Sequence, residues 1–411
     1  MRTRNFILGL LHGWFLRGGL AFADPYTVLP VFVRHVTSAS WVVGLTAPLM
    51  RGGGFLPQIL TARYAETVAK QKSILVAVVA VRFASWLGIA AATYFLAGTS
   101  PLLALVVVLG LLLVFSLAGG VGAVPFQELL ARLFPPTLRG RFLSLRQLGG
   151  GLMAVLAGAG VKIILDQPLR FASRYALLFL LSAGTMSIGF LALVLIREPA
   201  IEPVTRSMQP LPHFMRRLGG ILRTNAHLRR VLTAELLLRT INICLPFLVL
   251  DFRARLGAGV AFVAMALSAS MTGQLVSNLW WGRLSDHRGN RAVILTVNTM
   301  AAVTIAGALA VQSTWEALGV FALAGSVLSG NAVGYVNYLL ELAPRTERPA
   351  FISLRGTLTS PMLFLGVPGG LLVDAFGYTS VEVLALVGTL AGVVAAFRLP
   401  CLRSRPSGMS R

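Results

Sequence analysis

The chain has 411 residues, of which 56% are hydrophobic and only 12% are charged, and its formal net charge is +22. So few charged side chains could not cover the surface of a soluble protein, and the chain has room for many membrane-spanning runs of about 20 apolar residues. No cluster of Lys and Arg is interleaved with aromatic residues, which excludes a typical nucleic-acid interface. The two cysteines and five scattered histidines indicate neither a disulfide framework nor a metal site, so we expect no cofactor.

The apolar runs predict an all-α membrane protein with twelve transmembrane helices, because a helix bonds all of its backbone groups internally in lipid. The first run follows MRTRNF without a small-residue cleavage site, which indicates a retained first helix rather than a signal peptide. The expected spans are residues 8–33, 41–63, 73–96, 101–130, 142–165, 174–196, 231–252, 260–282, 292–312, 315–341, 351–375 and 379–399.

Basic residues are distributed unequally between the two sides of these spans. If both termini are cytoplasmic, the cytoplasmic segments hold 26 Lys and Arg residues and the opposite loops hold five. This bias is typical of the positive-inside rule. We therefore expect an integral protein of the cytoplasmic (plasma) membrane with both termini cytoplasmic, whose positive charge faces the anionic cytoplasmic leaflet of the lipid bilayer rather than nucleic acid.

Two stretches of the chain are related in sequence. Leu130–Arg146 recurs 209 positions later as Leu339–Arg355, with nine of the 17 paired positions identical. A shorter echo pairs Arg63 with Arg283 at an offset of 220. Self-similarity at one long period indicates an internal duplication. We therefore expect two pseudo-symmetric six-helix bundles, related by an axis along the membrane normal.

The duplication divides the chain into four parts. Residues 1–198 form the N-terminal six-helix bundle, 199–229 a central cytoplasmic linker, 230–400 the C-terminal six-helix bundle and 401–411 a cytoplasmic tail. In the linker, apolar residues at helical spacing are separated by arginines, which predicts an amphipathic helix on the membrane surface. A solvated tether with a basic face explains the same pattern equally well.

A loop between the eighth and ninth spans carries the most specific local motif, GRLSDHRGNR at residues 282–291. Together with the twelve spans, the two halves and the basic linker, this loop resembles the major facilitator superfamily. Gly282, Leu284, Asp286, Gly289 and Arg291 match the family's loop signature in register, whereas His287 and Asn290 replace basic positions. The resemblance implies transport by alternating access, with the binding site near the midplane between the halves.

The residues of this loop are candidates for a gate. Gly282 lets two helix backbones approach closely, and Asp286 can sit at the N-terminus of a neighbouring helix. Arg288 and Arg291 can pair with acids or with last-turn carbonyls, and Gly289 completes the motif. Contacts that form in one conformation and break in another make a gate latch. The alternative is a tight turn that only follows the positive-inside rule.

Four arginines recur at one register in the two halves, at the cytoplasmic ends of spans 5 and 11: Arg139, Arg146, Arg348 and Arg355. Snorkelling toward the leaflet explains them, and so does a shared role in pairing with the loop acids Glu66 and Asp286. Because the first-half loop has Glu66 in place of an aspartate and lacks the first glycine, we expect the two latches to differ.

Charged residues within the spans point to a binding site, because a charge in lipid is expensive and usually faces a cavity or a partner. The candidates for substrate binding or coupling are Arg17, Asp24, Arg51, Arg82 and Arg239. Cations outnumber acids, which favours a central cavity for an anionic or carboxylate-bearing solute. The alternative is that Arg17 pairs with Asp24, and Arg239 with Glu235 one helical turn away. Asp24 is the best candidate for carrying a proton as the coupling ion.

These observations predict a secondary active transporter that moves a small-molecule substrate across the membrane by alternating access. No Walker loop or enzyme signature is present, so we expect neither ATP drive nor enzymatic activity. Two alternatives stay open: an exporter of amphipathic or drug-like compounds, and a non-transporting membrane sensor or assembly factor with the same fold. Nothing in the sequence requires an oligomer, so we expect a monomer.

Overall fold

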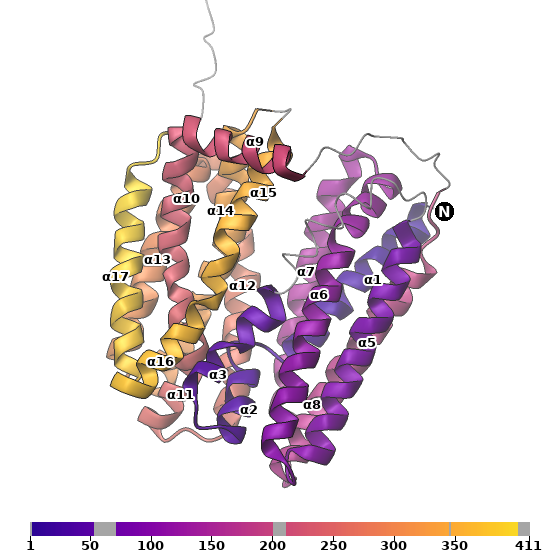
Figure 1. The fold of residues 1–411 in the computed structure, drawn as a ribbon, viewed down its shortest axis with the longest axis vertical. Coiled ribbons are helices and arrows are strands. Elements are labelled where there is room, and N and C mark those ends of the chain that lie inside the picture. The colour runs from indigo at the N-terminus through magenta and orange to yellow at the C-terminus, as the bar shows by residue number, and fades with distance from the viewer. Residues whose placement is uncertain (1, 53–70, 200–210, 345–346, 402–411) are drawn as a thin grey trace, which may run out of the picture.

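The chain folds into helices that run alongside one another. The computed structural model describes residues 2–52, 71–199, 211–344 and 347–401, and these ranges contain no β-strand (Figure 1). The predicted all-α fold is confirmed. Nine helical segments of the described residues are long and apolar enough to cross a membrane, and they correspond to predicted spans 3–7 and 9–12.

The other three predicted spans are also helical where they are described, which is consistent with twelve. The first is split into α1 (Arg2–Ala21) and α2 (Val28–Val36). The second begins as α3 (Ser40–Gly44) and the π-helical turn η1 (Pro48–Gly52), and the eighth is α12 (Ala261–Arg288). The first span breaks where Pro25 follows Asp24, since proline cannot donate a helical hydrogen bond.

Four long helices complete the N-terminal half: α5 (Gln71–Leu96), α6 (Pro101–Leu133), α7 (Pro136–Leu165) and α8 (Phe171–Leu195). The predicted linker helix is present as α9 (Leu211–Thr224). The C-terminal half consists of α10 (Ala226–Leu238), η2 (Arg239–Ile243), α11 (Leu245–Leu256), α12, α13 (Asn290–Ala310), α14 (Thr314–Leu342), α15 (Arg348–Thr359), η3 (Ser360–Leu365), α16 (Gly366–Phe376) and α17 (Tyr378–Phe397). Spans 7 and 11 are therefore each interrupted by a 3₁₀ turn.

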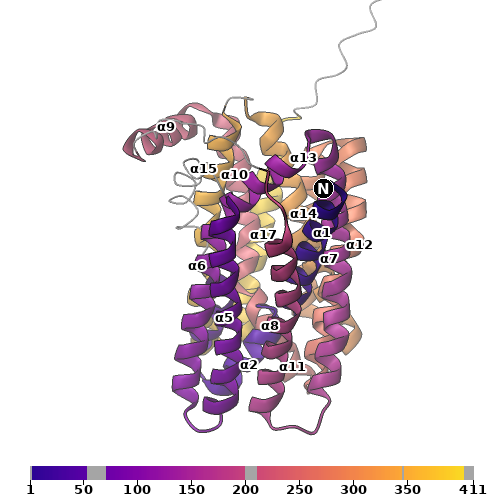
Figure 2. The same ribbon diagram turned by 90° about the vertical axis from the view of Figure 1, so that its right-hand side faces the viewer.

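The helix ends define two ends of the molecule. Figures 1 and 2 both show α9 lying across one end of the bundle, and Figure 1 places the N-terminus and the last turn of α17 at that same end. We call this the α9 end. Along the bundle, exposed Leu, Val, Ile and Phe side chains cover the outer faces of α6, α8 and α17, as expected of surfaces that contact lipid tails.

The two halves touch in the part of the bundle remote from the α9 end, where α3 packs against α16 (Figure 1). A Cβ atom on Gly44 would lie 1.9 Å from the carbonyl oxygen of Gly366, and one on Gly370 would lie 2.4 Å from the carbonyl of Ser40. The backbones therefore meet without intervening side chains. The Asp374 carboxylate accepts a hydrogen bond from the Ser40 N–H at 3.0 Å and fixes the contact.

We expect Gly44→Ala to destabilise this contact, because its methyl group has no room beside the backbone of α16. Overpacking of this kind costs about 1–3 kcal/mol. The matched control is Gly110→Ala on α6, where nothing lies within 4 Å of the added atom. Thermal unfolding of the two purified variants in detergent measures the difference, and equal stability of the two would contradict the backbone contact.

Candidate functional site: a cavity between the halves

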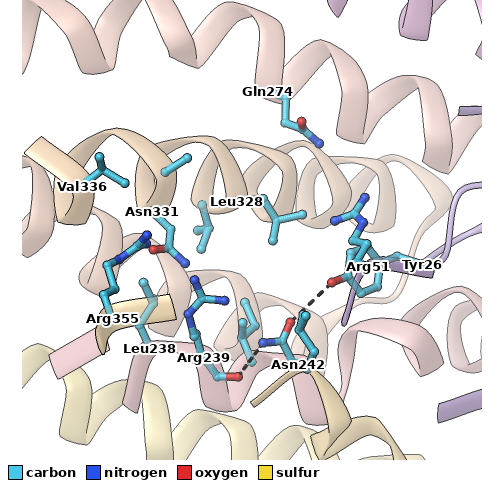
Figure 3. Close-up of a pocket in the computed structure, with 14 residues that line it drawn as sticks. Tyr26, Arg51, Leu238, Arg239, Asn242, Gln274, Leu328, Asn331, Val336 and Arg355 are labelled. Carbon is cyan, nitrogen blue, oxygen red and sulfur yellow. Dashed lines mark hydrogen bonds between the residues drawn. The ribbon is translucent and has the colours of Figure 1, made fainter. Parts of the chain in front are cut away.

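A cavity of about 390 Å³ lies between the two halves (Figure 3). Its walls come mainly from α10, η2, α14 and α15 of the C-terminal half, and the N-terminal half contributes Tyr26 and Arg51. The lining residues are Tyr26, Arg51, Leu238, Arg239, Ile241, Asn242, Gln274, Val327, Leu328, Asn331, Ala332, Val336, Arg355 and Leu363. A few polar groups among apolar walls are typical of a small-molecule site.

The cavity lies where the helices are interrupted. Arg51 belongs to η1 and precedes Gly52–Gly54 in the sequence, Arg239 begins η2, and Leu363 belongs to η3. Irregular backbone at membrane depth is tolerated where it lines a cavity or is buried in protein. The interruptions of spans 2 and 7 therefore place cationic and amide side chains at the cavity wall, and the interruption of span 11 contributes Leu363.

Glu235 is the shared ion-pair partner of two arginines that line this cavity. Its side chain is only 1% exposed, and its carboxylate accepts hydrogen bonds from Arg239 at 2.9 Å and from Arg355 at 2.6 Å. The predicted pairing of Arg239 with Glu235 is confirmed. The expectation that Arg355 pairs with a loop acid is wrong, because this arginine lies two turns into α15 and reaches Glu235 on α10.

Asp24 and Arg51 form a second ion pair at the other side of the cavity, 3.7 Å apart. Asp24 is buried and also accepts hydrogen bonds from the Tyr26 N–H and the Thr27 hydroxyl, both at 3.0 Å. Arg51 keeps 40% of its side chain exposed and stacks over the Tyr26 ring at 4.8 Å. The break after α1 turns Asp24 toward η1, which explains why its partner is Arg51 rather than Arg17.

Arg17 reaches across the interface instead, where its guanidinium donates to the amide oxygen of Gln274 at 2.7 Å. Three guanidinium groups, those of Arg51, Arg239 and Arg355, thus line the cavity. The described carboxylates that pair with them, Glu235 and Asp24, are buried and do not line it. Arg17 increases the surplus of positive charge. The predicted excess of cations is present in the structure.

Arg82 does not line this cavity, contrary to expectation. It projects from α5 into the N-terminal half, where its guanidinium lies over Phe115 at 4.1 Å. Arg146 projects from α7 into the same half and lies over Phe126 at 4.8 Å. Arg146 does not anchor α7 at the leaflet.

The residues of the predicted gating loop lie at the turn from α12 to α13. Gly289 has φ 81°, a conformation that favours glycine, and Arg291 donates to the last-turn carbonyl of Phe397 at 3.0 Å, as expected. Nothing lies within 4 Å of a Cβ atom built on Gly282, so the close helix approach expected there is wrong for this conformation. Asp286 and Arg288 occupy the last turn of α12.

The remaining repeated arginines lie at helix ends. Arg139 donates to the carbonyls of Ala131 and Phe134, both at 2.8 Å, and so caps the end of α6. Arg348 is the first residue of α15. Glu66, the proposed partner in the first-half loop, lies outside the described residues. Capping therefore explains Arg139 without a gating role.

Candidate residues were selected from the sequence by charge alone, so the uncharged polar residues of the cavity were not identified. Asn242, Gln274 and Asn331 face the cavity, and Asn242 donates to the Arg239 carbonyl at 2.9 Å (Figure 3). Amide side chains inside otherwise apolar spans are a signal that could have identified them, because each needs a hydrogen-bond partner away from lipid.

Comparison with known proteins agrees with this architecture. The family profile of the Major Facilitator Superfamily matches residues 236–409. The nucleoside transporter NupG superimposes with a TM-score of 0.74 at 12% identity, covering 97% of this chain and 99% of that one. The predicted resemblance to the Major Facilitator Superfamily is confirmed. The profile covers the C-terminal half of this chain, and the fold shared with NupG extends over nearly the whole of it.

Two further solved structures have a similar fold. An outward-facing bacterial homologue of the iron transporter ferroportin has a TM-score of 0.65 at 16% identity, covering 97% of this chain and 98% of that one. A D-xylose–proton symporter has a TM-score of 0.66 at 14% identity, covering 97% and 96%. Human solute carrier family 67 member A1 is 33% identical over 129 residues, and this stretch spans only 30% of either protein.

We expect Glu235→Gln to destabilise the protein strongly, because it leaves two inward-facing guanidinium groups without a carboxylate. Removing one partner of a buried ion pair costs about 3–5 kcal/mol. The matched control is Asp166→Asn, which breaks the exposed pair with Lys162 and should cost less than about 1 kcal/mol. Chemical unfolding in detergent measures both changes, and similar losses would show that Glu235 is not a buried partner.

Proposed function

We propose that this protein is a secondary transporter that moves a small anionic or carboxylate-bearing solute across the membrane by alternating access. The observation that carries the proposal is the convergence of Arg51, Arg239 and Arg355 on one cavity between the halves. A planar guanidinium binds a carboxylate through two parallel hydrogen bonds. The amides of Asn242, Gln274 and Asn331 add polar groups for the rest of the solute.

The surplus of positive charge supports this substrate class. A guanidinium without a counter-ion is unfavourable away from water, so a cavity with more cations than acids gains stability when an anion enters. A neutral or cationic solute provides no such gain. The transporters of similar fold are named for a nucleoside, iron and xylose, so the fold itself does not select a substrate, and the proposal rests on these side chains.

Asp24 is the proposed proton carrier. Its carboxylate holds Arg51, the most exposed arginine of the cavity. Protonation of Asp24 removes the negative charge that occupies Arg51 and frees the guanidinium for the solute. Proton and solute binding are then linked through one side chain. Asp24→Asn should therefore abolish the dependence of uptake on a pH gradient while solute binding persists.

The distribution of charge supports an orientation of the molecule in the membrane. We place the α9 end, with its linker and helix-end arginines, at the cytoplasmic side. The backbone contact between α3 and α16 then lies at the outer side, so the structure represents a conformation that is closed to the outside. A monomeric, non-enzymatic transporter of the cytoplasmic membrane fits these features, with residues 1–198 and 230–400 as the two moving bundles.

The proposal is tested with benzoate, its neutral analogue benzamide and the cation benzylamine. Purified wild-type protein in detergent should be stabilised by benzoate alone; a ligand at 100 times its Kd adds about 2.7 kcal/mol. Arg51→Gln should reduce this stabilisation, because it deletes the most accessible guanidinium of the cavity. Arg170→Gln, which alters an exposed arginine at the opposite end, should not.

Flux into proteoliposomes completes the test. Benzoate uptake that is lost in Arg51→Gln supports transport. Stabilisation by benzylamine or benzamide instead of benzoate would contradict the anionic class and favour an exporter of amphipathic compounds. Benzoate binding without flux would identify a sensor.

A further inference from the structure

The internal duplication allows one half of the molecule to be compared with the other. The repeat aligns Arg146 on α7 with Arg355 on α15, 209 positions later. In the first helix of each half, an offset of 222 aligns Arg17 with Arg239 and Gly13 with Glu235. These alignments predict which residues occupy equivalent places in the two bundles.

The packing of the helices supports the second offset independently. A Cβ atom on Gly189 of α8 would lie 3.2 Å from the backbone nitrogen of Leu16, and one on Gly392 of α17 would lie 3.2 Å from that of Leu238. Leu16 and Leu238 are also 222 positions apart. The same atoms therefore meet in both halves, and Gly13 is the structural counterpart of Glu235.

The two halves differ in the partner of the repeated arginine. In the C-terminal half, Arg355 binds the carboxylate of Glu235. In the N-terminal half, Arg146 crosses directly over Gly13, where a Cβ atom would lie 2.2 Å from its Cγ and Nε atoms. The N-terminal half therefore has the repeated arginine, Arg146, but has Gly13 at the place of the acid that neutralises Arg355 in the C-terminal half.

No other acid in the described part of the chain replaces it. The Nε atoms of Arg146 and Arg82 are both buried without a hydrogen-bond partner among the described residues. His12 lies between them in the same cluster: its ring is 5.2 Å from that of Phe126, and its Nδ1 contacts the Gly189 carbonyl at 3.1 Å. Aromatic rings supply faces for the guanidinium groups but no strong acceptors for their N–H donors.

The cluster adjoins the central cavity through Arg17. A Cβ atom on Gly150 of α7, one turn beyond Arg146, would lie 3.1 Å from the Arg17 side chain. Arg17 in turn donates to Gln274, which lines the cavity. Arg82 and Arg146 are both partly exposed, although their Nε atoms are buried.

We propose that Arg146, assisted by Arg82 and Arg17, forms a second carboxylate subsite in the N-terminal half, in which the solute supplies the carboxylate that Glu235 supplies in the other half. This subsite rests on the proposed transport of an anionic solute and makes its chemistry more specific. Phe115, Phe126 and Phe190 surround the arginines. They favour a carboxylate attached to a flat, apolar or aromatic body.

The test is to build the missing acid into the chain. Gly13→Glu places a tethered carboxylate where Glu235 lies in the C-terminal half, whereas Gly13→Gln adds a side chain of the same size without the charge. Both variants require the same displacement of Arg146, so their difference isolates the carboxylate. We expect benzoate affinity, measured by calorimetry on the full-length protein in detergent, to be at least tenfold weaker in Gly13→Glu than in Gly13→Gln.

Variants of the arginine provide a second test if the glycine variants fail to fold. Arg146→Gln should weaken benzoate binding at least tenfold and Arg146→Lys less, while Arg141→Gln, an exposed arginine of the same helix, should bind like wild type. Benzoate binding that is lost in Arg51→Gln but unchanged in Gly13→Glu and Arg146→Gln would overturn the subsite alone. Absence of benzoate binding to the wild-type protein would overturn the proposed substrate class as well.

Discussion

The carboxylate of Glu235 and the two guanidinium groups that hold it are the interaction on which the cavity depends. Spans 7 and 11 are both interrupted near the cavity, and an interrupted helix in lipid has backbone groups that need other partners. Glu235 on α10 binds Arg239 at the start of η2 and Arg355 on α15, so one buried acid links the two interrupted spans. The two interruptions are stabilised together, because the charges of Glu235, Arg239 and Arg355 neutralise one another where α10 packs against η2 and α15.

The helix breaks also determine which side chains face the cavity. A continuous helix presents side chains to a neighbour and hides its backbone, whereas a break turns the chain and brings side chains such as Arg51 and Asn242 to face a void. The charged residues bring positive charge to this void, and the amides add directional hydrogen bonds. The polar groups that face the cavity thus come in part from the interruption of spans that are otherwise regular.

The sequence predicted the parts of this structure that depend on local composition. Apolar length identified the spans, and the cost of charge in lipid identified Arg51 and Arg239 as facing a cavity. Pairing between distant elements was not predictable: Asp24 lies seven residues from Arg17 in sequence, yet the break at Pro25 turns it toward Arg51. Arg82 was wrongly expected to line the cavity for a similar reason. Composition cannot show whether a buried charge faces the interface between the two halves or the interior of its own bundle.

The contact of Gly44 with Gly366 is made by the backbone alone, so this end of the molecule is closed without the help of side chains that could recognise a solute. Because two backbones close this end with no side chain between them, no rotamer change can open it, and only the movement of whole helices can. A seal of this kind has no charge or shape of its own by which to distinguish solutes. On the proposal made above, selection is the task of the arginines deeper in the protein, and substitutions there would leave the backbone contact at this end unchanged.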